Sequence, residues 1–159
     1  MTDPIVRNGD GTREPGADWL FKASALTTDG AFDFMVGEVA YASGPPLHTH
    51  DVQHDTFYVL SGTLTVQLGD TVEELHAGDF VTIPPGTPHT FDNLDPDGRV
   101  EAINVMVPGG LGLLFGELAA SLSAQDPDTA GREAARRHGV IRVGPTLPEK
   151  LGLTPPDHP

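Results

Sequence analysis

Cysteine is absent from this chain of 159 residues. Disulfide bonds, thiolate catalysis and zinc or iron–sulfur sites with cysteine ligands are therefore excluded. Basic residues are scarce as well, because nine Lys and Arg stand against 23 Asp and Glu and leave a formal net charge of −14. Nucleic acids and anionic membranes bind proteins through clustered Lys and Arg, so we expect neither as a partner.

Long apolar runs are missing too. No segment approaches the roughly 18 consecutive apolar residues that cross a membrane as a helix. Residues 1–10 also lack the apolar segment of a secretory signal peptide. We therefore expect a cytoplasmic protein without membrane contact, and its length suits a single domain with a core of its own.

Turn-forming residues, in contrast, are abundant, with 19 Gly and 15 Pro. This composition argues against a helical bundle and favours many short strands. Apolar and polar residues alternate over several short segments, and Gly69 and Asp70 between two of them predict a tight turn. About eight such strands between residues 31 and 107, with turn signals roughly every 8 to 12 residues, predict an all-β sandwich or barrel.

The C-terminal part has a different pattern. Apolar residues at helical spacing predict an amphipathic helix over about 111–123, and a second short helix is predicted over 128–138, ended by Gly139. We expect three regions: a flexible arm (1–16), the barrel (17–110), and C-terminal helices with a Pro-rich tail (111–159) that pack on the barrel. Within the tail, residues 144–159 are expected to be irregular.

Five of the seven histidines lie within residues 48–89. His48 and His50 are two positions apart, so an extended segment presents both imidazoles on one face. Asp55 has the same parity as the apolar Phe57 and Val59, which are expected to point inward. A carboxylate on an inward face is costly unless it is paired or coordinated. These residues are therefore candidates for a buried metal site.

His89 follows a rigid turn of sequence Pro-Pro-Gly at residues 84–86. Together with His48, His50 and Asp55 it makes a set of three imidazoles and one carboxylate. Such a set suits one divalent transition metal ion, and its ligands do not distinguish Fe, Mn, Ni, Co, Cu or Zn.

Each candidate also has a simpler interpretation. Most His-x-His pairs are solvated or hydrogen-bonded, an isolated Asp55 is commonly a loop or cap carboxylate, and an isolated His89 is commonly a turn residue. His76 is expected to be an exposed turn residue and His138 a cation at a helix C-terminus. Only the joint pattern favours the metal site.

With these residues assembled, the sequence resembles a small single-domain cupin. The first cupin motif has two histidines, a carboxylate and a glycine, and it is matched by His48, His50, Asp55 and Gly62. The second motif is matched completely by Gly78, Pro84, Gly86, His89 and Asn93. The resemblance extends to bacterial cupins that are similar to quercetin 2,3-dioxygenase. It implies a cupin-type double-stranded β-helix, or jelly-roll barrel, with a short C-terminal helical extension.

The resemblance also implies a ligand set and a role for one ligand. His48, His50, Asp55 and His89 would bind the metal, and Asp55 would be the catalytic base. The family has Glu where this chain has Asp55, so His54 is an alternative fourth ligand. The family's glycine six positions before the first ligand is replaced by Ala42, and Gly44 is expected to supply a similar turn.

The favoured function is a metal-dependent dioxygenase that acts on a small oxygenated or aromatic molecule. One alternative is an isomerase, epimerase or cyclase that takes its base from Tyr41, Tyr58, His54 or Asp55. Another is a non-catalytic cupin that binds a small molecule. The barrel mouth would be lined by apolar residues for which core packing is the simpler interpretation: Phe34, Phe57, Val59, Phe91 and Met106. The resemblance also implies a homodimer.

Overall fold

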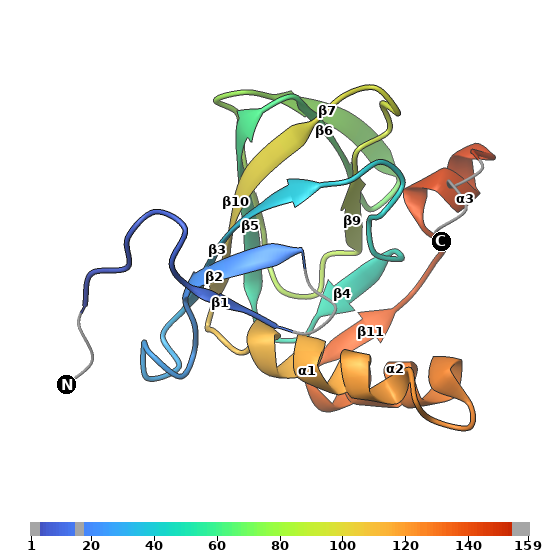
Figure 1. Cartoon of the computed structure of the whole chain (residues 1–159). Coiled ribbons are helices and arrows are strands. Elements are labelled where there is room, and N and C mark those ends of the chain that lie inside the picture. Colours follow the sequence, from blue (N-terminus) through green and yellow to red (C-terminus); the bar gives the residue numbers. More distant parts are fainter. Residues whose placement is uncertain (1–3, 15–17, 154–159) are drawn as a thin grey trace.

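The computed structural model describes residues 4–14 and 18–153, whose strands form two antiparallel sheets that face each other as a barrel (Figure 1). The six-stranded sheet has the order β1 (Thr12–Arg13), β2 (Trp19–Ala23), β3 (Asp33–Val39), β10 (Val100–Val107), β5 (His54–Ser61) and β8 (Phe80–Ile83). The five-stranded sheet has the order β11 (Val140–Arg142), β4 (His48–His50), β9 (His89–Asp92), β6 (Thr63–Leu68) and β7 (Thr71–His76). The predicted fold class is confirmed.

Strand β5 shows why these residues form a barrel. Asp55, Phe57 and Val59 are buried, whereas Tyr58 and Leu60 face outward. The inward side chains join a core between the two sheets, whose buried members are Val39, Phe57, Val59, Leu64, Val66, Ile83 and Val100. This alternation is the signature of a strand with one face on a core.

Two glycines have conformations that side chains rarely adopt. Gly69 (φ +58°) forms the predicted tight turn between β6 and β7 together with Asp70. Gly62 (φ +78°) joins β5 to β6, and a Cβ atom there would lie 2.1 Å from the carbonyl oxygen of Arg99. Gly62 therefore requires the absence of a side chain, and the φ of Gly69 makes a side chain there unfavourable.

The prediction that Phe34 of β3 points into the barrel is wrong. Asp33 and Met35 are buried, and Phe34 lies on the other face of the strand. Asp33 is tolerated inside because its carboxylate accepts three backbone N–H groups, from Ala25 at 2.6 Å, Gly110 at 2.8 Å and Leu111 at 2.7 Å. Once Asp33 points inward, the period of two places Phe34 outside.

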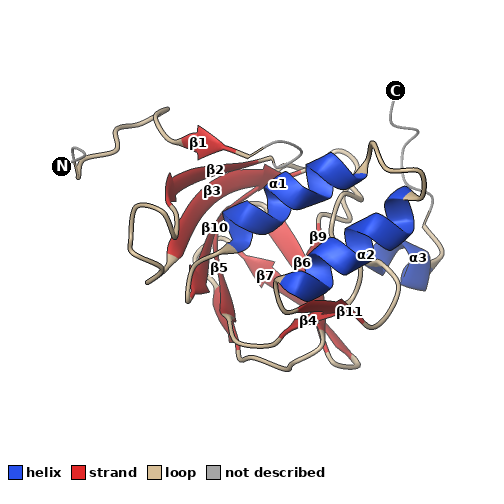
Figure 2. Cartoon of the chain, turned by 90° about the horizontal axis from the view of Figure 1, so that it is seen from below, coloured by secondary structure: helices blue, strands red, loops and turns tan. Residues whose placement is uncertain are grey.

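Two helices follow the barrel as predicted, α1 (Leu111–Ser121) and α2 (Pro127–Arg137). They pack side by side across one end of the barrel (Figure 2). The side chain of Asp126 accepts the Thr129 N–H and caps α2, and Gly139 (φ +70°) follows its end.

Three other segments depart from the prediction. Thr12–Arg13 in the expected flexible arm forms β1 and pairs with β2, and β11 was not expected. The helix α3 (Leu147–Leu151) lies in the segment expected to be irregular. Thr146 and Glu149 form a capping box at its start, a sequence signal strong enough to begin a short helix among prolines. Residues 154–159 of the predicted tail lie outside the described residues.

Among the described residues, no helix is both long and apolar enough to cross a membrane.

Candidate metal centre

The four predicted ligands come from three strands that meet inside the barrel. His48 and His50 lie on β4, Asp55 on β5 and His89 on β9. Strands β4 and β9 are antiparallel, and His48 is directly opposite His89. Opposite residues in such a pair project from the same face, so the pairing of the strands brings these two imidazoles together.

The donor atoms of the four side chains all lie within 4.8 Å of one another, and all four residues are buried. Nε2 of His48 is 3.2 Å from Nε2 of His50. Oδ2 of Asp55 is 3.2 Å from Nε2 of His89 and 3.9 Å from Nε2 of His50. The structure thus gathers the four residues into one cluster that could hold a metal ion.

His54, the alternative fourth ligand, does not join this cluster. It precedes Asp55 on β5 and is exposed, because neighbouring residues of a strand point to opposite faces. The structure therefore places Asp55, and not His54, beside the three histidines.

Backbone hydrogen bonds orient two of the imidazoles. Nδ1 of His48 donates to the Pro46 carbonyl at 2.8 Å, and Nδ1 of His89 donates to the Thr87 carbonyl at 2.8 Å. In the neutral tautomer that makes these bonds, Nε2 carries a lone pair directed into the cluster. Nε2 of His89 then faces the Asp55 carboxylate as acceptor to acceptor. A cation between these lone pairs removes the mismatch, so the residues present fit a metal ion.

Burial keeps the histidines in the form that binds metals. Burial is the largest cause that lowers the pKa of His48 to about 4, and the nearby His89 and His50 lower it further. Burial also lowers the pKa of His50, although the Asp55 carboxylate acts in the opposite direction. Both imidazoles are therefore neutral near pH 7, as a metal ligand must be.

Asn104 completes the cluster and was missed in the sequence. Its Nδ2 donates to Oδ1 of Asp55 at 2.5 Å and to the Thr56 carbonyl at 3.0 Å. The side chain is buried on β10, where Ala102 and Met106 are also buried. A polar residue on an inward face was the signal that identified Asp55, and it would also have identified Asn104.

A cavity of about 530 Å³ opens beside the cluster, between the barrel and the helices. Its barrel wall includes His48, His50, Asp55, Phe57 and Asn104. Its helical wall includes Leu114, Phe115 and Leu118 of α1, Arg132 and Arg136 of α2, and Arg142 of β11. Most of the lining is apolar, which suits a small organic molecule held next to polar groups.

The apolar residues expected at the barrel mouth separate into three groups. Phe57 and Phe91 line the cavity, as predicted. Val59 and Met106 are core residues, which matches their simpler interpretation. Phe34 lies on the opposite face of β3 from the buried Met35 and does not reach the cavity.

Other candidate side chains lie away from the cluster. Tyr58 and His54 are exposed on β5, and Tyr41 is not part of the cavity lining. Of the four bases considered for an isomerase, only Asp55 reaches the cavity. His76 is exposed, and His138 at the end of α2 binds Glu117 at 2.9 Å.

The turn before β4 differs from the expected one. Gly44 was expected to supply this turn, but Ala42 itself adopts the left-handed conformation (φ +54°). Gly44 is required for another reason, because a Cβ atom there would lie 1.9 Å from the Phe91 carbonyl oxygen. The turn that leads to His48 thus combines a strained alanine with a close backbone contact.

Comparisons with known proteins agree with this geometry. Residues 35–106 match the family model described as "Cupin domain". The chain is 30% identical over 107 residues to the quercetin 2,3-dioxygenase of Bacillus subtilis (strain 168), which covers 66% of this chain and 31% of that protein. It is 36% identical over 73 residues to the quercetin 2,3-dioxygenase of Aspergillus japonicus, covering 43% of this chain and 20% of that protein. The chain thus spans about a third and a fifth of these relatives.

Solved structures show the same fold. One is an uncharacterized conserved protein with a double-stranded β-helix domain from Klebsiella pneumoniae subsp. pneumoniae MGH 78578 (TM-score 0.53, 22% identity, covering 68% of this chain and 92% of that one). Another is a Cupin 2 conserved barrel domain protein from Salinispora arenicola CNS-205 (TM-score 0.51, 17% identity, covering 87% of this chain and 98% of that one).

Proposed function

We propose that this chain, which matches the cupin domain model over residues 35–106, is a metal-dependent dioxygenase acting on a small oxygenated or aromatic molecule. The observation that carries the proposal is the buried cluster of His48, His50, Asp55 and His89 beside an apolar cavity of about 530 Å³. Support comes also from the two partial relatives named quercetin 2,3-dioxygenase.

The three histidines and Asp55 would hold one divalent ion. When bound, a redox-active ion would act as a Lewis acid toward substrate oxygens and would support reaction with dioxygen. A ligand set of four leaves positions for substrate if the ion is six-coordinate.

Asp55 would also move a proton. Its Oδ1 accepts the Asn104 amide and its Oδ2 faces the imidazoles, so Oδ2 would both bind the ion and accept the proton of a substrate hydroxyl held beside it. Because Asn104 is itself held by the Thr56 carbonyl, the carboxylate is fixed before substrate arrives. Asp55 is shorter by one methylene than the family's Glu, and the bond from Asn104 sets where this shorter side chain ends.

The cavity would select the shape of the substrate. Phe57 and Phe91 of the barrel pack with their ring centroids 4.5 Å apart, and Leu114 and Phe115 of α1 lie across from them on the helical wall. Such apolar walls accept a flat ring and exclude water from the cluster.

Oxygen consumption tests the proposal. The protein is loaded separately with Fe, Mn, Ni, Co, Cu and Zn and assayed with quercetin and with simpler catechols in an oxygen electrode. We expect uptake with a redox-active ion and none with Zn. Asp55→Asn keeps the size of the side chain but weakens it as a base, and turnover should fall about 100-fold or more. His54→Gln, the exposed neighbour, should leave turnover unchanged.

Other outcomes contradict the dioxygenase. Conversion of substrate without oxygen uptake would indicate the isomerase, epimerase or cyclase, and binding without turnover would indicate a non-catalytic cupin. The homodimer and the cytoplasmic location stay predictions, the first of which sedimentation would test.

A further inference from the structure

Arginines gather at one end of the cavity. Arg132 and Arg136 of α2 and Arg142 of β11 line it together with His48, His50 and Asp55. The same three arginines line an adjoining depression of about 460 Å³ with Asp128, Gly144 and Pro145. Three of the nine basic residues of a chain with net charge −14 are thus gathered at one place.

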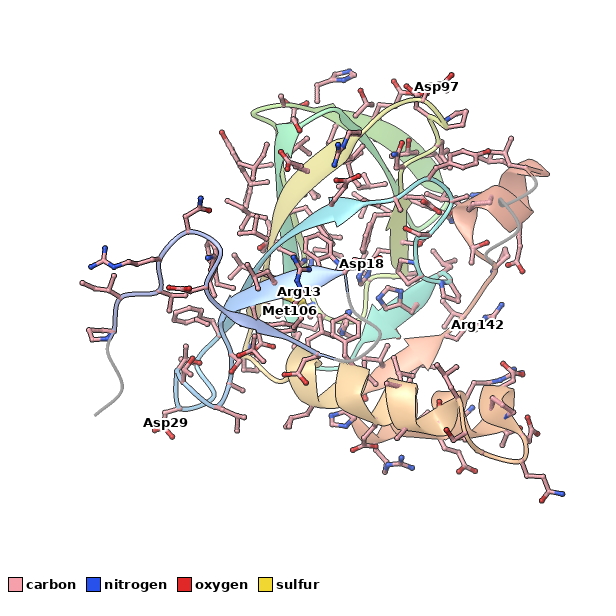
Figure 3. The ribbon with its side chains drawn as sticks, viewed as in Figure 1. Arg13, Asp18, Asp29, Asp97, Met106 and Arg142 are labelled. Carbon is pink, nitrogen blue, oxygen red and sulfur yellow. The ribbon has the colours of Figure 1, made fainter. Side chains whose placement is uncertain are left out.

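The fold brings these arginines close to the candidate metal centre from two elements, β11 and α2. Strand β11 is antiparallel to β4, and Arg142 lies directly opposite His48 (Figure 3 labels Arg142 on β11). Opposite residues share a face, so Arg142 projects from the side of the sheet that carries the His48 imidazole. On α2, Arg132 and Arg136 are four residues apart and share one face of the helix.

The arginines are unequally neutralised. Arg132 forms an ion pair with Asp128 on the same helix. Arg142 donates to the Gly144 carbonyl at 3.2 Å and lies 3.9 Å from Glu149. The side chain of Arg136 has no hydrogen bond or ion pair with any described residue. Positive charge at this end is therefore available to a ligand.

Asp128 of α2, which pairs with Arg132, also lines this cavity, and the carboxylates that line the rest of it lie on the barrel side. Asp18 immediately precedes β2, and Glu38 of β3 is paired with Arg99 (Figure 3 labels Asp18). They disfavour an anion on their side of the cavity, and the arginines favour one on the side of α2 and β11. The cavity therefore orients an anionic molecule.

We propose that the substrate carries a carboxylate that binds Arg136 and Arg142, while its oxygenated ring lies beside the candidate metal centre. This inference rests on the proposed function, because it names the class of molecule that the same cavity takes. A guanidinium presents two parallel N–H groups that match a carboxylate. A single negative charge suits the one unpaired and one weakly paired arginine. The apolar helical wall between the two ends accepts the body of the molecule.

A matched pair of molecules tests this inference. The acid is 3-(3,4-dihydroxyphenyl)propionate, which has a catechol, a ring and a carboxylate, and the neutral control is its methyl ester. Calorimetry under argon measures the affinity of both for the Zn-loaded protein, after its Zn content has been determined. Phenyl phosphate serves as a third arm for a dianion. We expect the acid to bind about tenfold more tightly than the ester and more tightly than the phosphate, with a preference that shrinks as salt is added.

Variants locate the effect. Arg136→Gln and Arg142→Gln should each remove most of the preference for the acid, because each deletes one guanidinium. Arg137→Gln is the matched control, since Arg137 follows Arg136 but pairs with Glu117 of α1 and does not line the cavity. It should leave the preference unchanged.

The inference is overturned if acid and ester bind equally, if neither binds, or if the preference survives both cavity substitutions. Tighter binding of the phosphate also overturns the carboxylate assignment. A protein that takes up no metal contradicts the proposed function alone. In that case the comparison of acid and ester is made on the metal-free protein, and it decides the inference separately.

Discussion

The two walls of the cavity differ in origin. The part of the barrel wall that carries His48, His50, Asp55 and Asn104 lies within residues 35–106, which match the cupin family model. The helical wall is built from α1, α2 and β11, all of which lie beyond residue 106. The match to the cupin family model therefore informs about the metal centre but not about the opposite wall. We infer that the barrel wall carries the chemistry and the helical wall selects the molecule.

The largest expected effect is the loss of metal affinity when a ligand on the barrel wall is removed. His89→Ala deletes an imidazole of the barrel wall, and metal affinity should fall by more than about 100-fold, because few donor atoms remain. Metal titration followed by mass spectrometry measures the loss. His76→Ala removes an exposed histidine and should bind metal as the unchanged protein does. Equal affinities for the two variants would contradict the assigned cluster.

Asp33 joins the walls to each other. It accepts the N–H groups of Gly110 and Leu111 at the start of α1 from its position on β3. Asp33→Ala leaves these buried donors without a partner, so the free energy of unfolding should fall by about 3 kcal/mol. Amide exchange in α1 should accelerate more than exchange in β5. The exposed Asp97→Ala should change stability by less than about 0.5 kcal/mol. Equal acceleration of amide exchange in α1 and in β5 would contradict a specific role of Asp33 in holding α1 to the barrel.

The metal-free protein should become less stable in acid, because of a histidine on the barrel wall. The pKa of His48 is about 4 in the folded protein and near 6.5 in a free histidine, so the unfolded chain binds the extra proton between these values. Stability is therefore retained above pH 6.5 and lost as the pH falls toward 4, by up to about 3 kcal/mol. Denaturant titrations of the unchanged protein and of His48→Gln measure this loss. A variant with the same pH dependence as the unchanged protein would contradict it.

Asn104 should strengthen metal binding without being a ligand itself. Asn104→Leu removes the hydrogen bond to Asp55, and metal affinity should fall by about tenfold, less than for loss of a ligand. Gln67→Leu is a suitable control, because Gln67 is a buried amide that donates to the Gly69 carbonyl. An effect on metal affinity as large for Gln67→Leu would indicate general loss of packing and not orientation of Asp55.

The smallest effect concerns the turn before β4. Ala42 has a φ of +54°, where a side chain is strained. Ala42→Gly should therefore raise the free energy of unfolding by about 1 kcal/mol. Ala40→Gly, at a position without positive φ, should have the opposite sign. Thermal unfolding of both variants makes the comparison, and a lower stability of Ala42→Gly would contradict the assigned strain.

Sequence reasoning succeeded where local rules decide the structure. The period of two brings His48 and His50 to one face, and helical spacing located α1 and α2. It failed at Phe34, because alternation does not say which face is inside until the partners of Asp33 are known. The arginine group could not be predicted at all. It depends on the pairing of β11 with β4, which joins residues about 90 positions apart in the sequence.

Above all, we propose that His48, His50, His89 and Asp55 bind one metal ion. The most direct test is the metal content of protein purified without chelators, with X-ray absorption to identify the ligands. We predict one divalent ion per chain, with three imidazole ligands, and loss of this ion in His89→Ala. A protein that stays without metal at saturating concentrations of each candidate ion, or that binds it equally well after His48→Ala and His89→Ala, would contradict the account.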